Sequence, residues 1–193
     1  MKTLVIRNIK LVVAFISVLF LSASFLSTSA SADYFAGGRS NNAKPYVYYD
    51  ASVASKGYTA HYDAGRSYWN SHSNVNIRKS STTSSTTDRY YIGTTSTSGL
   101  LGRISPKNSS GTEVSTGSTW SYVTVTMYDN QMRAQSNYTA SYIRMNAAHE
   151  IGHSIKMAHV AKAYNSVMPQ GWRAIPSSLT SYDSGEVTKK WPF

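Results

Sequence analysis

HEIGHSIKMAH, at residues 149–159, is the stretch of this sequence that says most about its structure. His149 and His153 are four residues apart, so on an α-helix they lie one above the other on the same face. Ile151 projects from the opposite face, because successive helical residues are separated by about 100°. Three of the five histidines in the chain fall within this stretch. It therefore predicts a helix that packs on one side and presents imidazoles on the other.

The residue types in this stretch, and their spacing, are typical of a metal centre. Two histidines at positions i and i+4 can hold one divalent ion, and a catalytic zinc needs three protein ligands and one open position. His159, six residues after His153, is the third candidate ligand. Glu150 is next to His149, where its carboxylate can take a proton from water that zinc has made acidic. We therefore expect Zn²⁺ held by His149, His153 and His159, with Glu150 as general base.

Apolar residues before and within the motif recur at helical spacing and mark one face of the predicted helix. The apolar stripe consists of Ala140, Ile143, Ala147, Ile151 and Ile155. Asn137 or Ser136 is expected to cap the helix, because both side chains can accept a hydrogen bond from a free backbone amide.

Residues 149–159 resemble the long zinc-binding motif of the metzincin metallopeptidases, H-E-x-x-H-x-x-G-x-x-H. A second element agrees: Ser-Val-Met-Pro at residues 166–169 is similar to the Met-turn of that clan. The resemblance implies that Met168 is a hydrophobic floor under the metal and has no catalytic role.

Within the metzincins, the chain looks most like the matrixin-like group, the matrix-metalloproteinase-type catalytic domains. Gly-Leu-Leu-Gly at residues 99–102 resembles their substrate-facing edge strand. Residues 179–183 resemble the start of their last helix, where an aspartate, here Asp183, ties to the Met-turn. The resemblance covers about residues 46–191, although only the zinc motif and the Met-turn are specific.

The fold implied by this resemblance is an α+β, metzincin-like one. It has a five-stranded twisted mixed sheet with two main helices, a small lower subdomain after the zinc helix, and a C-terminal helix. Local sequence patterns agree with this order of elements. They predict strands near residues 46–49, 75–77, 89–92, 99–104 and 120–127, and further helices near 54–72 and 180–190.

Lys156 departs from the family motif, which has glycine at this position. Glycine lets the chain leave the helix in a left-handed conformation and swing the third histidine back to the metal. Lysine can adopt a positive φ at a cost on the order of 1 kcal/mol, so we expect a strained turn with His159 as third ligand. If the helix ran on, the third ligand would have to be another residue, such as Glu186 or Asp183.

The substrate-binding residues are expected on both sides of the metal. An edge strand carrying Leu100, Leu101 and Gly102 can bind an extended peptide by strand addition. On the other side, the resemblance places the wall of the main specificity pocket in residues 170–176. Our hypothesis is that this wall, which includes Trp172, selects the side chain that follows the scissile bond. The alternative is that Trp172 packs in the core of the lower subdomain.

Residues 1–32 have the features of a secretory signal peptide. The basic residues at its head are Lys2, Arg7 and Lys10. An apolar run without charge follows at residues 11–26, and Ala-Ser-Ala at 30–32 fits a cleavage site. We therefore expect a catalytic domain at residues 33–193 that is secreted and extracellular, either free or associated with the cell envelope. The alternative is an uncleaved membrane anchor.

The composition limits the kinds of site that the chain can build. It has no cysteine, which excludes disulfides and thiolate ligands and leaves His, Asp and Glu for zinc. The formal net charge of +10 falls to +7 without residues 1–32. Such a charge attracts anionic surfaces, but the basic residues are scattered, which favours a solvated surface over a specific polyanion site.

The expected partner is a protein or peptide substrate. We expect no specific nucleic acid, no stable membrane insertion after signal cleavage, and a monomer. Two alternatives remain open at this point. One is a catalytically weak or inactive metzincin relative, impaired by Lys156. The other is a basic secreted module that binds cell-envelope polymers through its fifteen tyrosines and four tryptophans.

Overall fold

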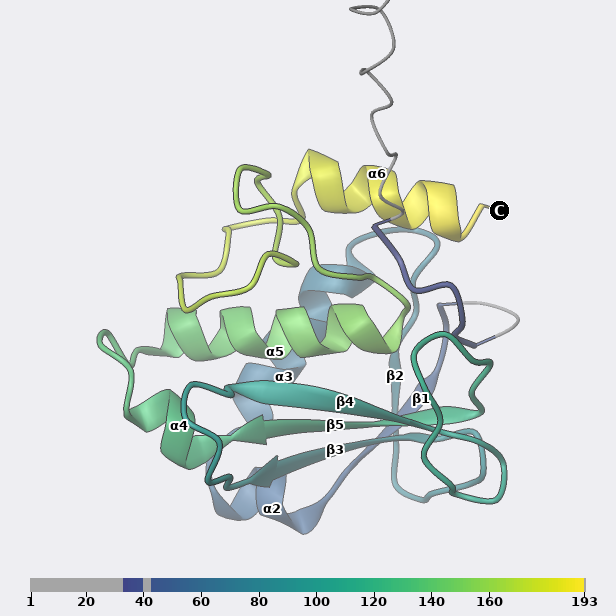
Figure 1. Ribbon diagram of the computed structural model, residues 1–193, viewed down its shortest axis with the longest axis horizontal. Helices are drawn as coiled ribbons and strands as arrows, with labels where there is room; N and C mark the ends of the chain where they lie inside the picture. Colours follow the sequence, from purple (N-terminus) through teal and green to yellow (C-terminus); the bar gives the residue numbers. More distant parts are fainter. Residues whose placement is uncertain (1–32, 40–42, 193) are drawn as a thin grey trace, which may run out of the picture. The chain divides into compact units, whose positions relative to one another are not determined.

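The computed structural model describes residues 33–39 and 43–192. The predicted signal peptide, residues 1–32, lies outside the described residues. The described part contains helices and one mixed sheet, which confirms the α+β class. Figure 1 shows the longest helix, α5, lying along the sheet, and α6 lying beyond α5 on the side away from the sheet.

Five strands of the described residues form one sheet in the order β2-β1-β3-β5-β4. Their bounds are β1 Tyr46–Tyr49, β2 Arg78–Ser80, β3 Asp88–Gly93, β4 Gly102–Lys107 and β5 Tyr122–Tyr128. The first four strands in this order run parallel, and β4 pairs antiparallel with β5, with Gly102 opposite Met127. The mixed sheet is therefore as expected, and β4 is an edge strand that can accept an extended chain.

The helices of the described residues are α2 Ala51–Ser55, α3 Thr59–Asn70, α4 Asp129–Arg133, α5 Ala140–Ser154 and α6 Ser181–Lys190. The helix expected at 54–72 is split in two, because Gly57 adopts a φ of 79° between α2 and α3. The strand expected at 75–77 begins three residues later, as β2, and α4 was not predicted. None of the helices in the described part is long and apolar enough to cross a bilayer.

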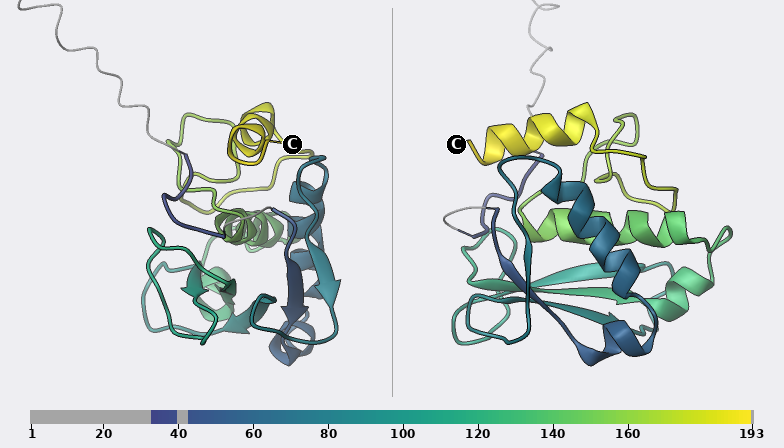
Figure 2. Two further views of the ribbon diagram at one scale, coloured as in Figure 1. Left: turned by 90° about the vertical axis from the view of Figure 1, so that its right-hand side faces the viewer. Right: turned by 180° about the vertical axis from the view of Figure 1, so that it is seen from behind.

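Helix α5 packs against α3 and against strands β4 and β5, and the rear view in Figure 2 shows α3 crossing α5. The Trp69 indole of α3 is buried and donates a hydrogen bond to the Ala148 carbonyl at 2.7 Å, which links the two helices. The apolar stripe of α5 is buried as predicted from Ile143 onward, whereas Ala140 is exposed. The position of the sequence motif is thus fixed by packing on two sides.

The cap predicted for α5 is wrong. The N-cap residue is Thr139, whose side chain makes no capping hydrogen bond, and Asn137 lies two residues earlier with a φ of 59°. Asparagine tolerates this left-handed conformation better than most residues, so Asn137 serves the turn that precedes the helix.

Candidate active site

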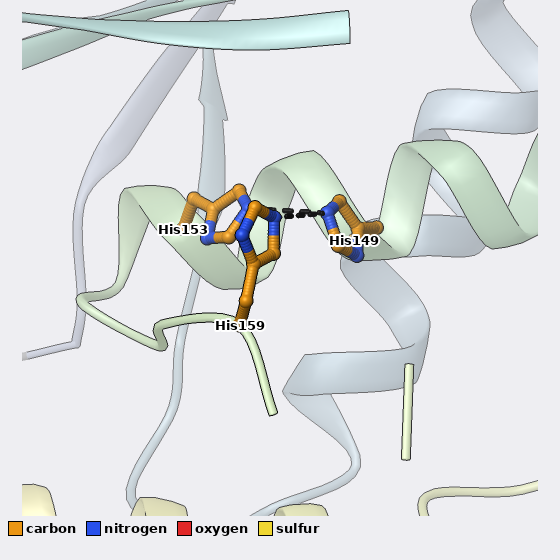
Figure 3. Close-up of side chains that lie close together, drawn as sticks. All are labelled: His149, His153 and His159. Atoms are coloured by element: carbon orange, nitrogen blue, oxygen red, sulfur yellow. Dashed lines mark hydrogen bonds between the residues drawn. The ribbon is translucent and has the colours of Figure 1, made fainter. Parts of the chain in front are cut away.

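Three imidazoles converge at the C-terminal half of α5. His149 and His153 project from successive turns of the helix, and His159 comes from the segment that follows it (Figure 3). The Nε2 atoms are 3.1 Å apart for His149 and His153, 3.2 Å for His149 and His159, and 3.1 Å for His153 and His159. Tetrahedral zinc with Zn–N distances of about 2.0–2.1 Å would separate two ligand nitrogens by roughly 3.3 Å. The three side chains can therefore hold one metal ion.

Hydrogen bonds to the backbone fix the tautomers of two of these rings. His149 Nδ1 is 2.9 Å from the Val167 carbonyl, and His153 Nδ1 is 2.7 Å from the Met157 carbonyl. A carbonyl only accepts, so each Nδ1 carries the proton and each Nε2 carries a lone pair. The two Nε2 atoms cannot donate to each other, whereas a cation between them would satisfy both. The donor set therefore fits a divalent metal ion.

The protonation of the three rings also suits metal binding. Burial lowers the pKa of His149 to about 4 and lowers the pKa of His153 and of His159 as well. The rings are therefore neutral at pH 7, which is the form that binds a metal ion.

Lys156 forms the turn that returns the chain to this centre. Helix α5 ends at Ser154, and Lys156 adopts a φ of 80°, as the sequence predicted. Its amide donates to the His153 carbonyl at 3.0 Å, and the Met157 amide donates to the Gly152 carbonyl at 3.0 Å. These bonds close the end of the helix in the manner of a left-handed C-cap and aim the chain at His159.

The side chain of Lys156 is buried, which its sequence context did not indicate. Its methylene groups pack against Gly38, where a Cβ atom would lie only 2.2 Å from Lys156 Cε. This packing offsets part of the cost of the positive φ. The ammonium group lies 5.9 Å from the Trp191 ring centroid. Burial and the neighbouring Lys190 ammonium lower the pKa of Lys156 to about 8.

Lys156→Met should make the folded protein more stable than wild type at pH 7. The folded chain releases the Lys156 proton near pH 8 and the unfolded chain near the ordinary value of 10.5. Between these values the unfolded state binds more protons, so wild-type stability gains a contribution as pH rises. The variant should lack that gain. Urea unfolding at neutral and alkaline pH measures how the free energy of unfolding changes with pH. Lys162→Met, at an exposed position, is the control. The same pH dependence in wild type and in Lys156→Met would contradict this account.

Glu150 lies beside the three histidines with an unpaired carboxylate oxygen. Its side chain is buried, and Oε2 has no hydrogen-bond partner within the described residues. Burial raises the pKa of the carboxyl to about 8. The start of β4 passes so close that a Cβ atom on Gly102 would lie 2.6 Å from Glu150 Oε1. The carboxyl group is therefore held between the helix and the edge strand, with one oxygen free to bind a further group.

The histidines and Glu150 line an open cleft of about 350 Å³. The other lining residues are Phe35, Gly99, Leu100, Leu101, Gly102, Arg103, Ile104, Met145, Asn146, Gln170 and Gly171. Leu100, Leu101 and Gly102, which were expected on one edge strand, are among them, but Leu100 and Leu101 precede β4, which begins at Gly102. Met145 and Asn146 lie one helical turn before His149, so the period of the helix could have predicted them. Phe35 is far from the motif in sequence, and no local pattern pointed to it.

No protein-family model matches the chain, and no curated protein matches it in sequence. Solved structures do resemble it. The crystal structure of myroilysin has a TM-score of 0.50 at 11% identity, and the match covers 89% of this chain and 96% of that chain. High choriolytic enzyme 1, a hatching-enzyme zinc protease from Oryzias latipes (medaka fish), has a TM-score of 0.43 at 8% identity, covering 84% and 96%.

The fold is of the metzincin type. The likeness to myroilysin supports this, together with the five-stranded mixed sheet and the order of its helices. The long segment after α5 and the C-terminal α6 complete the architecture expected from the sequence.

In this metzincin-type fold, the Met168 side chain lies directly beneath the motif helix. It is 2% exposed, and its Sδ atom occupies the space that a Cβ on Gly152 would need. The adjacent Val167 carbonyl accepts the hydrogen bond from His149 described above. The turn thus contacts the backbone between the two helical histidines and orients one of them.

Asp183 ties this turn to α6. One carboxylate oxygen accepts a hydrogen bond from the Ser166 hydroxyl, and the other accepts one from the Val167 amide at 3.0 Å. Glu186 forms an ion pair with Lys189. The two carboxylates considered as alternative third ligands are therefore engaged elsewhere, and His159 takes the place beside His149 and His153.

Trp172 lies next to the cleft but is not among the residues that line it. Its ring packs on Tyr142 with a centroid distance of 5.5 Å, and its indole nitrogen donates to the Ser136 carbonyl at 2.7 Å. Gln170 and Gly171 form the cleft wall instead.

Proposed function

We propose that the chain is a secreted zinc endopeptidase of the matrixin-like type, with residues 33–193 as its catalytic domain. One observation carries the proposal. Three imidazole Nε2 atoms converge beside a buried carboxylate that has a free oxygen, in a cleft bordered by an edge strand. That combination is what metal-assisted hydrolysis of a peptide bond requires.

His149, His153 and His159 would hold the zinc ion. Bound zinc supplies Lewis-acid chemistry, in that it polarises a carbonyl group and makes water more acidic. Glu150 accepts the proton of the attacking water on its carboxylate and then gives it to the departing amine nitrogen. The carboxyl group is held in the same cleft as the three histidines with one oxygen unpaired, so it can accept the proton and return it without leaving its place.

Strand β4 would bind the substrate backbone. Its outer edge borders the cleft, and main-chain hydrogen bonds to an added strand fix the register of an extended peptide. Leu100 and Leu101 provide apolar contacts on this side. Across the cleft, Gln170 and Gly171 would contact the side chain after the scissile bond, with Trp172 behind them. Trp172→Ala should therefore alter the preferred residue at that position in a peptide-library profile.

Cleavage of casein and of a peptide library by purified residues 33–193 tests the proposed function. We expect hydrolysis with zinc, loss of hydrolysis with a chelator, and recovery on adding zinc back. His153→Ala should be inactive under all three conditions. Protein that binds stoichiometric zinc but cleaves neither substrate would contradict the endopeptidase proposal.

N-terminal sequencing of the exported protein tests secretion, and Asp33 is the expected first residue.

Gly102→Ala should lower kcat for peptide cleavage by about tenfold, because the new methyl group must displace the Glu150 carboxylate. Zinc content should not change. Gly93→Ala in β3 is the matched control, since its Cβ would lie 3.4 Å from its nearest neighbour, an ordinary contact. Steady-state kinetics with zinc analysis decides the matter, and equal kcat values for both variants would show that Gly102 does not position the carboxylate.

A further inference from the structure

Residues 33–39, which precede the first strand, cross the C-terminal end of the motif helix (dark purple in Figure 1). The Phe35 amide donates to the Lys156 carbonyl at 2.8 Å, and the Ala158 amide donates to the Asp33 carbonyl at 2.9 Å. Tyr34 and Met157 form an antiparallel bridge between these bonds. The segment is therefore paired with the turn that connects His153 to His159.

The other end of this segment is fixed to the loop before β5. The Gly38 amide donates to the Ser118 carbonyl at 2.9 Å, and the Trp120 amide donates to the Gly38 carbonyl at 3.3 Å. The Lys156 side chain packs against Gly38 as well. Anchored at both ends, the segment presents its side chains in a defined position.

Phe35 is the side chain of this segment that lines the cleft. Its ring is 5.5 Å from the His153 ring and meets the buried Trp120 edge-on at 6.3 Å. The Phe35 side chain is only partly buried, so one part of the ring is open to the cleft. Ile104 of β4 lines the same cleft. Arg103 also lines the cleft, and its guanidinium pairs with Glu113, a carboxylate that it shares with Lys107. This end of the cleft is suited to apolar side chains.

The position of Phe35 along α5 indicates which substrate residue it meets. The wall formed by Gln170 and Gly171 lies toward the N-terminal half of α5, because the next residue, Trp172, packs on Tyr142. Phe35 contacts His153, at the other end of the helix. From Asn146 to His153 the helix rises about 10 Å, roughly the length of three extended residues. If the wall formed by Gln170 and Gly171 contacts the substrate residue after the scissile bond, Phe35 contacts about the third substrate residue before that bond.

We propose that Phe35 is a specificity-determining residue that selects an apolar or aromatic side chain about three residues before the scissile bond. The proposal rests on the proposed endopeptidase function and names a subsite of the same cleft. An aromatic ring beside a partly apolar groove stabilises a bound apolar side chain by removing both surfaces from water.

The test compares cleavage profiles of zinc-loaded wild type, Phe35→Ala, Phe35→Leu and Tyr34→Ala on one peptide library. Tyr34 is the matched control, because it belongs to the same bridge but its ring lies 5.0 Å from Lys190 Nζ and does not line the cleft. Phe35→Ala should lower kcat/KM on the best wild-type peptide by about tenfold. The apolar preference near the third position before the bond should disappear, and the preference after the bond should persist.

A second readout does not depend on turnover. In a Glu150→Gln background, Phe35→Ala should weaken binding of the best peptide by about the same factor, measured by calorimetry. Phe35→Leu should keep part of the preference and carries the test if Phe35→Ala does not fold. An unchanged Phe35→Ala profile, or an equal change in Tyr34→Ala, would overturn this inference alone. Absence of cleavage by zinc-loaded wild type would overturn the proposed function, and this inference with it.

Discussion

Glu150→Gln should lower kcat/KM for peptide cleavage by at least about a hundredfold and leave zinc bound. Glutamine has the shape of glutamate, so it fits the space between α5 and Gly102, but it cannot accept a proton from water. Glu150 is also not one of the three residues whose ligand atoms converge, so removing its charge should leave the metal centre intact.

Glu186→Gln is the control for this substitution. Glu186 lies on α6 in an ion pair with Lys189, and the sequence alone had left it open as a third ligand. We expect this variant to keep both activity and zinc. Kinetics and metal analysis on the two variants give the answer. Residual activity above about a tenth of wild type in Glu150→Gln would mean that another group takes the proton.

Gly152→Ala should destabilise the zinc-free fold by about 1–3 kcal/mol, although alanine is the better helix former. A Cβ atom at this position would lie 2.4 Å from Met168 Sδ and 2.7 Å from Trp69 Cζ2. The Met168 thioether can move. The Trp69 indole cannot move easily, because it is fully buried and its nitrogen donates a hydrogen bond to the Ala148 carbonyl. Relieving the clash should therefore cost free energy. A displaced Met-turn should also weaken zinc binding, because Val167 orients His149.

Gly185→Ala should change the free energy of unfolding in the opposite direction and stabilise the fold. Gly185 lies inside α6, and its Cβ would meet no heavy atom within 4 Å. Because nothing clashes here, the higher helix propensity of alanine should raise the free energy of unfolding by up to about 1 kcal/mol. Denaturant unfolding of both variants measures the contrast. Stabilisation by both substitutions would show that the packing between helix and Met-turn is looser than the structure indicates.

Most of the residues that the fold brings together at the candidate site could be predicted from the sequence, because the patterns that indicate them are local. His149, Glu150 and His153 are fixed by helical periodicity, and the helix is specified by an apolar stripe that had to be buried. Strands β1, β3 and β5 were recognisable because β-branched and aromatic residues are concentrated in them. The position of Asp183 against the Met-turn followed only from the resemblance, since no local pattern relates residues so far apart.

The features that local patterns missed depend on tertiary contacts. Phe35 reaches the cleft because residues 33–38 pair with two distant segments, and such pairing leaves no periodic signal. Trp172 was expected in the cleft, but it is held beside it by Tyr142 and Ser136. The break at Gly57 was also overlooked, although glycine is the residue that most readily ends a helix in this way.

Lys156 shows how packing can replace an expected residue type. From the motif alone, lysine in place of glycine predicts strain, and the φ of 80° agrees. The structure adds a compensation, because the aliphatic part of the side chain covers Gly38 and helps to fix the segment that carries Phe35. The departure from the motif is therefore tied to a feature of this cleft, and the turn that leads to His159 is kept.

The most direct test of the account is the zinc content of residues 33–193, measured by elemental analysis after reconstitution and removal of excess metal. We predict one zinc ion per chain in wild type and in Glu150→Gln, and loss of stoichiometric zinc in His149→Ala, His153→Ala and His159→Ala. Folded wild-type protein without stoichiometric zinc would contradict the account, and so would zinc retained in all three histidine variants.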